Sequence, residues 1–354
     1  MRFGLLQGAH CSAGVTPQQR YTEIIDEAVC AEESGFEFYA TAEQHFDPGS
    51  GTTTIPASEI IQAAVAARTS VIRLIWASAV LPIHHPIRVA EKAATLDIIS
   101  KGRFELGTAR SNDLPTMRAF GVDPATTRDR WEEALGIVIS AMVDGEVDHD
   151  GAFWQIPKTT ISPQPVQRPH PPLWYASTSL SGHEVAGSLG LGVISGNSLP
   201  GGWDYVQEAA DTYRRAVAQA KPIGGASVNN GVMGFCFAAH VSSSREQALR
   251  EASATVEAIL ETVTKMFSRL AKQGAGYEYM REIEAIYERR DDLDYIIDRA
   301  PYISVGTPDF LVDRFKRMEL MGYDRIALRI DGMPHETVMQ SIRAFGEHVL
   351  PNFA

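Results

Sequence analysis

The sequence predicts an α/β fold, specifically a (β/α)8 TIM barrel with insertions. Short apolar segments that read as buried strands recur along the chain, and segments of helical periodicity separate almost all of them. Eight strand candidates can be found, which is the number that closes such a barrel. The alternative is a doubly wound nucleotide-binding sheet, but its usual phosphate-binding fingerprints are missing. There is no Walker A sequence, and Gly190-Leu191-Gly192 lacks the third glycine.

The strand candidates alternate with helices in the way that parallel sheets require. They begin near residues 2, 36, 73, 103, 173, 191, 231 and 325. The clearest unit starts with an apolar strand at 73–79 and continues with a helix that begins at Pro86, where a missing N–H costs nothing. Gly102 ends this helix and a strand at 104–107 follows it. A strand–helix–strand unit of this length implies a parallel sheet.

Further helices are expected between the other strands. Thr16 is a helix cap, and Pro17 opens a helix that ends at Gly35. The other expected helices are 58–68, 127–143, 181–189, 203–220, a long helix capped by Ser244, a helix opened by 307–309, and 335–349. The last strand candidate before residue 268 spans 231–241.

Two segments depart from this alternation. Residues 144–164 read as a hairpin-like insertion, because glycine, aspartate and Phe153-Trp154 interrupt the pattern. Residues 268–300 are charged and read as a helical excursion, which is a solvated surface helix, a lid over the active site or an oligomer contact. We expect the whole chain, 1–354, to form a single barrel domain.

Composition excludes several classes of protein. The 354 residues are 44% hydrophobic, which is enough for a sizeable core, and no apolar run approaches the roughly 20 residues of a membrane span. The N-terminus has no signal-peptide pattern. Cys11, Cys30 and Cys236 are scattered and predict neither disulfides nor zinc, so the cytoplasm is the expected compartment. The net charge of −12 argues against nucleic acid or anionic membranes as partners.

Candidate site residues follow the predicted strands, because the chemistry of such barrels lies at the C-terminal ends of the strands. His45 follows the second strand and can hold a hydrogen bond or transfer a proton near neutral pH. Arg110 follows the fourth strand, and its guanidinium suits either a phosphate or a surface ion pair. A hydroxyl run follows the fifth strand and is either an anion site or a capping run: Ser177, Thr178, Ser179 and Ser181.

Other chemistries lack their motifs. His84-His85 is better explained as a loop or cap than as a metal site, since adjacent side chains point in different directions and Pro86 follows. Neither H-x-H nor H-E-x-x-H occurs, so no metal is expected, and the absence of G-x-S-x-G leaves a serine hydrolase unsupported.

Several motifs resemble the signature of the bacterial luciferase-like flavin-dependent monooxygenases. They are Glu43-Gln44-His45-Phe46, Leu81-Pro82, His85-Pro86, Ala90-Glu91, Leu96-Asp97, Ser100-Lys101-Gly102-Arg103-Phe104, Pro165-Val166-Gln167 and Pro169-His170-Pro171-Pro172-Leu173-Trp174. The resemblance is dense over residues 1–200 and thin from about 225 to 300.

The resemblance implies a set of cofactor contacts. It places the phosphate of reduced FMN on Arg110, Ser177, Thr178 and Ser181. It also implies a non-proline cis peptide at Ala77-Ser78, lying against the flavin ring, while Val193 and Ile194 at the end of the sixth strand would line the ring plane. His45, together with Gln44, would face the flavin or the substrate.

One position departs from the family pattern. Gln44 stands where the family has the first histidine of Glu-His-His-Phe. An amide cannot serve as a base at neutral pH, so luciferase-like aldehyde oxidation with light is not expected.

The function that the resemblance implies is a monooxygenase that uses reduced FMN and O2. It would oxygenate a small-molecule organic substrate through a C4a-(hydro)peroxyflavin. Because no dinucleotide fingerprint is visible, a separate flavin reductase would supply the reduced FMN. Three alternatives stay open: a deazaflavin-dependent oxidoreductase that transfers hydride, a non-catalytic luciferase-like subunit, and an unrelated barrel hydrolase that would be active without flavin or oxygen. The resemblance also implies a homodimer.

Overall fold

Eight parallel strands close into a barrel, as the sequence predicted. The structure is a computed structural model that describes residues 1–354 except 47–53, 112, 197–200, 272–286 and 354. Around the barrel the strands are β1 (Arg2–Gln7), β2 (Phe38–Thr41), β3 (Arg73–Val80), β4 (Phe104–Ala109), β7 (Leu173–Ser177), β8 (Gly192–Ser195), β9 (Val232–Cys236) and β12 (Arg325–Leu328). β12 pairs with β1 and closes the ring. Each corresponds to one of the eight strand candidates.

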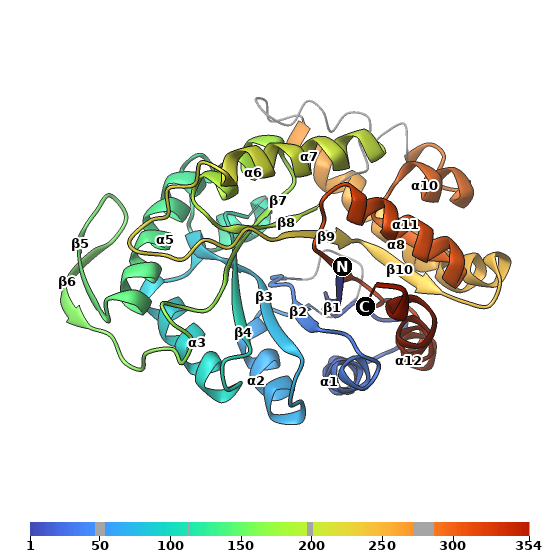
Figure 1. Ribbon diagram of the computed structural model, residues 1–354, viewed down its shortest axis with the longest axis horizontal. Helices are drawn as coiled ribbons and strands as arrows, with labels where there is room; N and C mark the ends of the chain where they lie inside the picture. The colour runs from blue at the N-terminus through green and yellow to red at the C-terminus, as the bar shows by residue number, and fades with distance from the viewer. Residues whose placement is uncertain (47–53, 112, 197–200, 272–286, 354) are drawn as a thin grey trace.

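Helices cover the outside of the barrel (Figure 1). They are α1 (Pro17–Glu33), α2 (Ser58–Arg68), α3 (Pro86–Ile99), α4 (Leu114–Ala119), α5 (Thr127–Val143), α6 (Leu180–Ser188), α7 (Gly202–Val217), α8 (Arg245–Ala271), α10 (Leu293–Arg299), α11 (Pro308–Leu320) and α12 (His335–Ala344). The Thr16 hydroxyl accepts the Gln19 N–H and caps α1, as predicted. The short α4 was not predicted.

The expected insertion after α5 is an antiparallel hairpin. Its strands are β5 (Glu146–Asp150) and β6 (Gln155–Thr160). The hairpin projects beside α5, far from β10 and α8 at the opposite edge of the molecule (Figure 1). The Glu133 carboxylate on α5 accepts the N–H groups of Phe153 and Trp154 and so ties the hairpin turn to the helix.

The predicted strand at 231–241 is wrong in one respect, because it is two strands. β9 stays in the barrel, whereas β10 (Ala238–Val241) leaves it and pairs in parallel with β11 (Ile303–Gly306), which was not predicted. The Phe237 N–H between the two strands donates to the carbonyl of Tyr302 rather than to a barrel strand. The chain therefore changes sheets at Phe237, within one uninterrupted apolar run.

The expected excursion at 268–300 is described only in part. The end of α8 and α10 are helical, as predicted, and residues 272–286 lie outside the described residues. One buried apolar cluster includes residues of the barrel, of its helices and of β10 and β11, among them Val193, Val241 and Ile303. This shared core supports the proposal that the barrel and the two-stranded sheet of β10 and β11 belong to a single domain.

The barrel interior contains a second apolar cluster and, at its N-terminal end, a buried ion pair. The cluster consists of Leu6, Phe38, Ala40, Ile75, Trp174, Ile194, Met233 and Ala327. Below it, the Glu105 carboxylate accepts hydrogen bonds from Arg325 (2.9 Å) and from the Trp174 indole (2.6 Å), and it also pairs with Arg73. Burial raises the pKa of Glu105, but the two arginines outweigh burial and the net direction is downward. These buried side chains close the N-terminal end of the barrel, so its open end lies at the C-terminal ends of the strands.

Two expectations from composition can be compared with the structure. Among the described residues, no helix combines the length and the apolar character needed to cross a bilayer. The three cysteines are free thiols, in agreement with the absence of a disulfide framework.

Candidate active site

Small side chains form the floor of the barrel mouth. Ala42 after β2, Ala77 in β3 and Ala176 in β7 pack on the interior cluster from the C-terminal side, together with Phe235 of β9. Each lies two residues beyond a cluster member on its own strand, so all four belong to the inner face. Three of these four side chains are single methyl groups and the fourth is a phenyl ring, so the surface is apolar.

The edge of this floor contains an unusual peptide bond. The Ala77–Ser78 bond is cis, which is the geometry that the family resemblance implied. Ser78 is 7% exposed, and its Oγ has no hydrogen-bond partner among the described residues. A buried hydroxyl without a partner is destabilising.

A buried carboxylate joins two histidines at the same end of the barrel. Oε1 of Glu43 accepts hydrogen bonds from Nε2 of His45 (2.9 Å) and Nε2 of His84 (2.8 Å). Burial raises the pKa of Glu43, but the two histidine hydrogen bonds outweigh burial and lower the pKa overall. Because an ionised carboxylate only accepts hydrogen bonds, both histidines carry a proton on Nε2. In both rings Nδ1 is therefore the nitrogen that does not bond to Glu43.

His84 gains a role that the sequence analysis did not give it. The predicted loop assignment is correct in its backbone, because His84 precedes α3, but its ring reaches Glu43 and packs edge-on against Trp76 at 5.9 Å. Gln44 lies beside this cluster, and its N–H donates to the carbonyl of Ile55.

A small pocket lies between the ends of β4 and β7 and the start of α6. Its lining residues are Arg110, Arg128, Trp131, Tyr175, Ser179, Ser181, Gly182 and Val185. Arg110 and Ser181 were expected to hold a phosphate, and the fold brings them together here. The first N–H groups of α6 have no partners within the helix, so the pocket combines a guanidinium, hydroxyls and a helix N-terminus.

Local structure explains how the hydroxyl run approaches the helix. The Ser179 hydroxyl caps α6 by accepting the Gly182 N–H at 3.2 Å. A Cβ on Gly182 would lie 1.9 Å from the Ser177 hydroxyl oxygen, so only glycine lets Ser177 lie against the first turn. Ser177 in turn donates to the carbonyl of Ser179, which folds the run into a tight turn.

The remaining predicted residues, Ile194, Val193 and Thr178, lie in different surroundings. Ile194 belongs to the barrel interior, whereas Val193 is buried in the outer cluster against the helices. Val193 therefore faces away from the mouth, because neighbouring residues in a strand point to opposite faces. The Thr178 carbonyl accepts the hydroxyl of Tyr205 at 2.5 Å, which anchors the loop after β7 to α7.

Sequence reasoning missed several residues that the fold places here. Arg128 reaches the pocket from α5, which no strand-end rule would have indicated. Gly182 had a local signal, because it follows the hydroxyl run by one residue. His10, Arg329 and Asp331, near the ends of β1 and β12, were not singled out either.

Comparisons with known proteins identify the family. The family model for luciferase-like monooxygenases matches residues 1–325. The chain belongs to this family. The oxygenase component of flavin-dependent trigonelline monooxygenase from Acinetobacter baylyi is 29% identical over 369 residues, covering 100% of this chain and 96% of that protein.

Two further relatives agree with the assignment to the luciferase-like monooxygenases. The FMNH(2)-dependent dimethylsulfone monooxygenase of Pseudomonas putida is 27% identical over 332 residues, covering 92% of this chain and 85% of the relative. The crystal structure of monooxygenase RslO1 from Streptomyces bottropensis has a TM-score of 0.80 at 25% identity and covers all of both chains. The predicted enzyme class is therefore confirmed: the protein is an oxidoreductase, a luciferase-like flavin-dependent monooxygenase.

Proposed function

We propose that this protein is the oxygenase component of a two-component system that uses reduced FMN and O2 to oxygenate a small organic molecule. The observation that carries the proposal is that two complementary surfaces lie at the C-terminal end of the barrel. One is a cationic pocket at Arg110, which suits a flavin phosphate, and the other is an apolar surface at Ala77, which suits a flavin ring. When bound, reduced FMN would supply the electrons and the oxygen activation.

The residues of this chain would bind and orient that cofactor. Arg110, Ser181 and the start of α6 would hold the phosphate, with Ser177 shaping the turn. Ala77 and Ile194 would lie under the ring, and the Ser78 hydroxyl would find its missing partner there. Val193 would not contact the ring, because it is buried on the other face of β8.

The Glu43–His45–His84 cluster would manage protons beside the flavin. Glu43 fixes the orientation of both rings, and His45 would exchange a proton through Nδ1. Gln44, as an amide, would contribute hydrogen bonds only.

Two relatives that are named as an oxygenase component and as FMNH(2)-dependent support a separate reductase as the partner. Their names give different substrates, so trigonelline and dimethylsulfone are the first compounds to test rather than an assignment. We also propose a cytoplasmic location, which the three scattered cysteines favour, and a homodimer, which the family resemblance implies.

Parallel anaerobic titrations with reduced FMN and a reduced deazaflavin test the proposed function. We expect reduced FMN to bind at least tenfold more tightly. A preference for the deazaflavin would favour hydride transfer, and binding of neither would favour a non-catalytic member of the family.

A further inference from the structure

Two polar side chains near the barrel mouth contain nitrogens without partners. Nη2 of Arg329 and Nδ1 of His10 are both buried and have no hydrogen-bond partner among the described residues. The Arg329 side chain is only 9% exposed. Leaving a buried guanidinium nitrogen without an acceptor is costly, and this cost points to a ligand that is bound during function.

Both groups face the open end of the barrel. Arg329 directly follows β12, in which Arg325 and Ala327 point inward, so alternation places Arg329 on the inner face as well. A Cβ on Gly8 would lie 3.2 Å from Nδ1 of His10 and 3.5 Å from Nη2 of Arg329. Gly8 is two residues beyond Leu6 of the interior cluster, so both nitrogens lie beside the inner face of β1.

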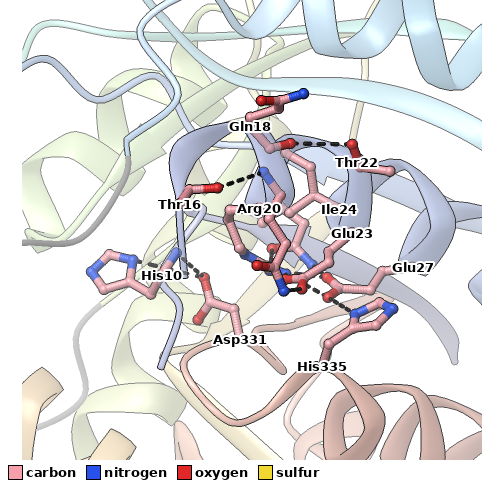
Figure 2. A network of polar contacts seen from close by, with 12 residues as sticks. His10, Thr16, Gln18, Arg20, Thr22, Glu23, Ile24, Glu27, Asp331 and His335 are labelled. Atoms are coloured by element: carbon pink, nitrogen blue, oxygen red, sulfur yellow. Dashed lines mark hydrogen bonds and ion pairs between the residues drawn. The ribbon is translucent and has the colours of Figure 1, made fainter. Parts of the chain in front are cut away.

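Asp331 fixes this pair while leaving the two nitrogens unused. Its Oδ1 accepts Nε–H of Arg329 at 2.7 Å, and its Oδ2 accepts the backbone N–H groups of Gly8 and His10, both at 3.2 Å. Figure 2 shows Asp331 beside His10. Nδ1 of His10 lies 3.7 Å from Oδ2, which is too long for a hydrogen bond. The Asp331 carboxylate thus fixes the orientation of the Arg329 guanidinium through Nε, and it leaves Nη2 without a partner.

Other nearby carboxylates are already engaged. Glu27 accepts both ends of the Arg20 guanidinium, at 2.6 and 3.0 Å, and also binds Nδ1 of His335 (Figure 2). Glu23 lies within 3.3 Å of the same arginine. Although Glu23, Glu27 and His335 lie close enough together to suggest a metal site, Arg20 already compensates the two carboxylates. None of these acceptors is bonded to Arg329.

We infer that Arg329 and His10 form a subsite for a carboxylate group of the organic substrate. A guanidinium pairs most strongly with carboxylates, because its N–H groups match the two oxygens and the hydrogen bonds are charge-assisted. Burial, with Arg329 as the next cause, lowers the pKa of His10 to about 4, so His10 is neutral at pH 7 and can donate one N–H without adding charge. The inference rests on the proposed function, since it names the substrate class of that site. It also places the substrate across the floor from the phosphate pocket.

Calorimetric titration of the FMN-loaded protein tests this subsite. The probes are acetate, benzoate and nicotinate, with benzamide and nicotinamide as neutral counterparts, and oxidised FMN blocks the phosphate pocket. We expect at least one acid to bind tenfold or more tightly than its amide. Arg329→Met should weaken that acid at least tenfold and leave FMN affinity within about twofold. Arg68→Met removes the same charge from an exposed position on α2 and should change nothing.

A second variant distinguishes loss of the subsite from a folding defect in Arg329→Met. His10→Leu leaves the Arg329–Asp331 pair intact and should weaken the acid severalfold. Equal binding of acid and amide, or no binding of any acid, would overturn the subsite. A loss of FMN affinity in Arg329→Met without loss of acid binding would also overturn it, because the guanidinium would then serve the flavin. If FMN itself fails to bind, the same acids are titrated into the flavin-free Arg110→Met protein, which separates failure of the subsite from failure of the proposed function.

Discussion

Nε2 of His84 lies 2.8 Å from Oε1 of Glu43, although 41 positions separate the two residues in the sequence. Glu43 follows β2 and His84 follows β3, and neighbouring parallel strands end at the same edge of the barrel. The same oxygen accepts Nε2–H of His45, so one buried carboxylate fixes two imidazole rings. This arrangement supports the proposed role of His45 in proton exchange at the mouth of the barrel.

Glu43→Gln tests the positioning role of this carboxylate. A glutamine keeps the size but loses the charge that holds both Nε2–H donors, so the rings should lose their fixed tautomer. We expect the oxygenated flavin complex to decay about tenfold faster in stopped-flow absorbance, with reduced FMN affinity little changed. Glu37→Gln removes the same charge from an exposed residue just before β2 and serves as the control. Equal decay rates in wild type and Glu43→Gln would show that Glu43 only supports the fold.

Arg110→Met tests the phosphate pocket. Loss of a charge-assisted hydrogen bond costs about 1.5–3 kcal/mol, so reduced FMN should bind about 10–100-fold more weakly. Reduced riboflavin has no phosphate, and its affinity should not change. Anaerobic fluorescence titration measures both constants. If the substitution weakens both flavins equally, Arg110 does not hold the phosphate.

His183 predicts a pH-dependent stability. Nδ1 of its buried ring lies 2.7 Å from the Ser179 carbonyl oxygen, to which it donates, and Nε2 accepts the Ser195 hydroxyl at 2.8 Å. Burial lowers the pKa of His183 to about 4. The unfolded chain therefore binds more protons between pH 6.5 and 4, and stability falls as pH falls through this range.

The size of the His183 effect follows from the same values. Between pH 7 and 4.5 this group should remove about 2–3 kcal/mol of the free energy of unfolding. Urea unfolding at both pH values should show a smaller pH-dependent loss in His183→Gln than in wild type. His348→Gln changes a half-exposed histidine and should keep the wild-type dependence. An identical pH dependence in His183→Gln and wild type would contradict the account.

The ion pair at the closed end of the barrel predicts a large loss of stability. Glu105→Ala leaves the buried Arg325 guanidinium without its carboxylate, which typically costs about 3–5 kcal/mol. Chemical denaturation measures this loss. Adding Arg325→Met to Glu105→Ala should recover part of it, because an apolar side chain then fills the position. A single substitution that costs less than about 1 kcal/mol would mean that water already compensates Arg325.

The barrel could be predicted from the sequence because short-range sequence signals define each of its helices and strands. Pro86, Gly102 and the apolar spacing between them define a helix without reference to the rest of the chain. The sheet change at Phe237 could not be predicted, because the residues on both sides are equally apolar and only the pairing with β11 separates them. β11 itself is four residues long and too short to show a period.

The candidate site was predictable where it lies at strand ends and not elsewhere. Arg110 and Ser181 both follow barrel strands, and the strand-end rule found them. Arg128 comes from a helix, and Glu43–His84 is a contact between distant segments, so their roles depend on the closed barrel. The sequence does not show which face of β8 each side chain occupies, so only the structure distinguishes the inward Ile194 from the outward Val193.

Rapid mixing of the anaerobic reduced-FMN complex with oxygenated buffer tests the central claim most directly. We predict a transient absorbance spectrum of a C4a-peroxyflavin that forms on wild type and outlives the oxidation of free reduced FMN. The same transient should be lost in Arg110→Met at flavin concentrations that this variant does not bind. Oxidation of the wild-type complex at the rate of free flavin, with no intermediate, would contradict the assignment of this protein as an oxygenase.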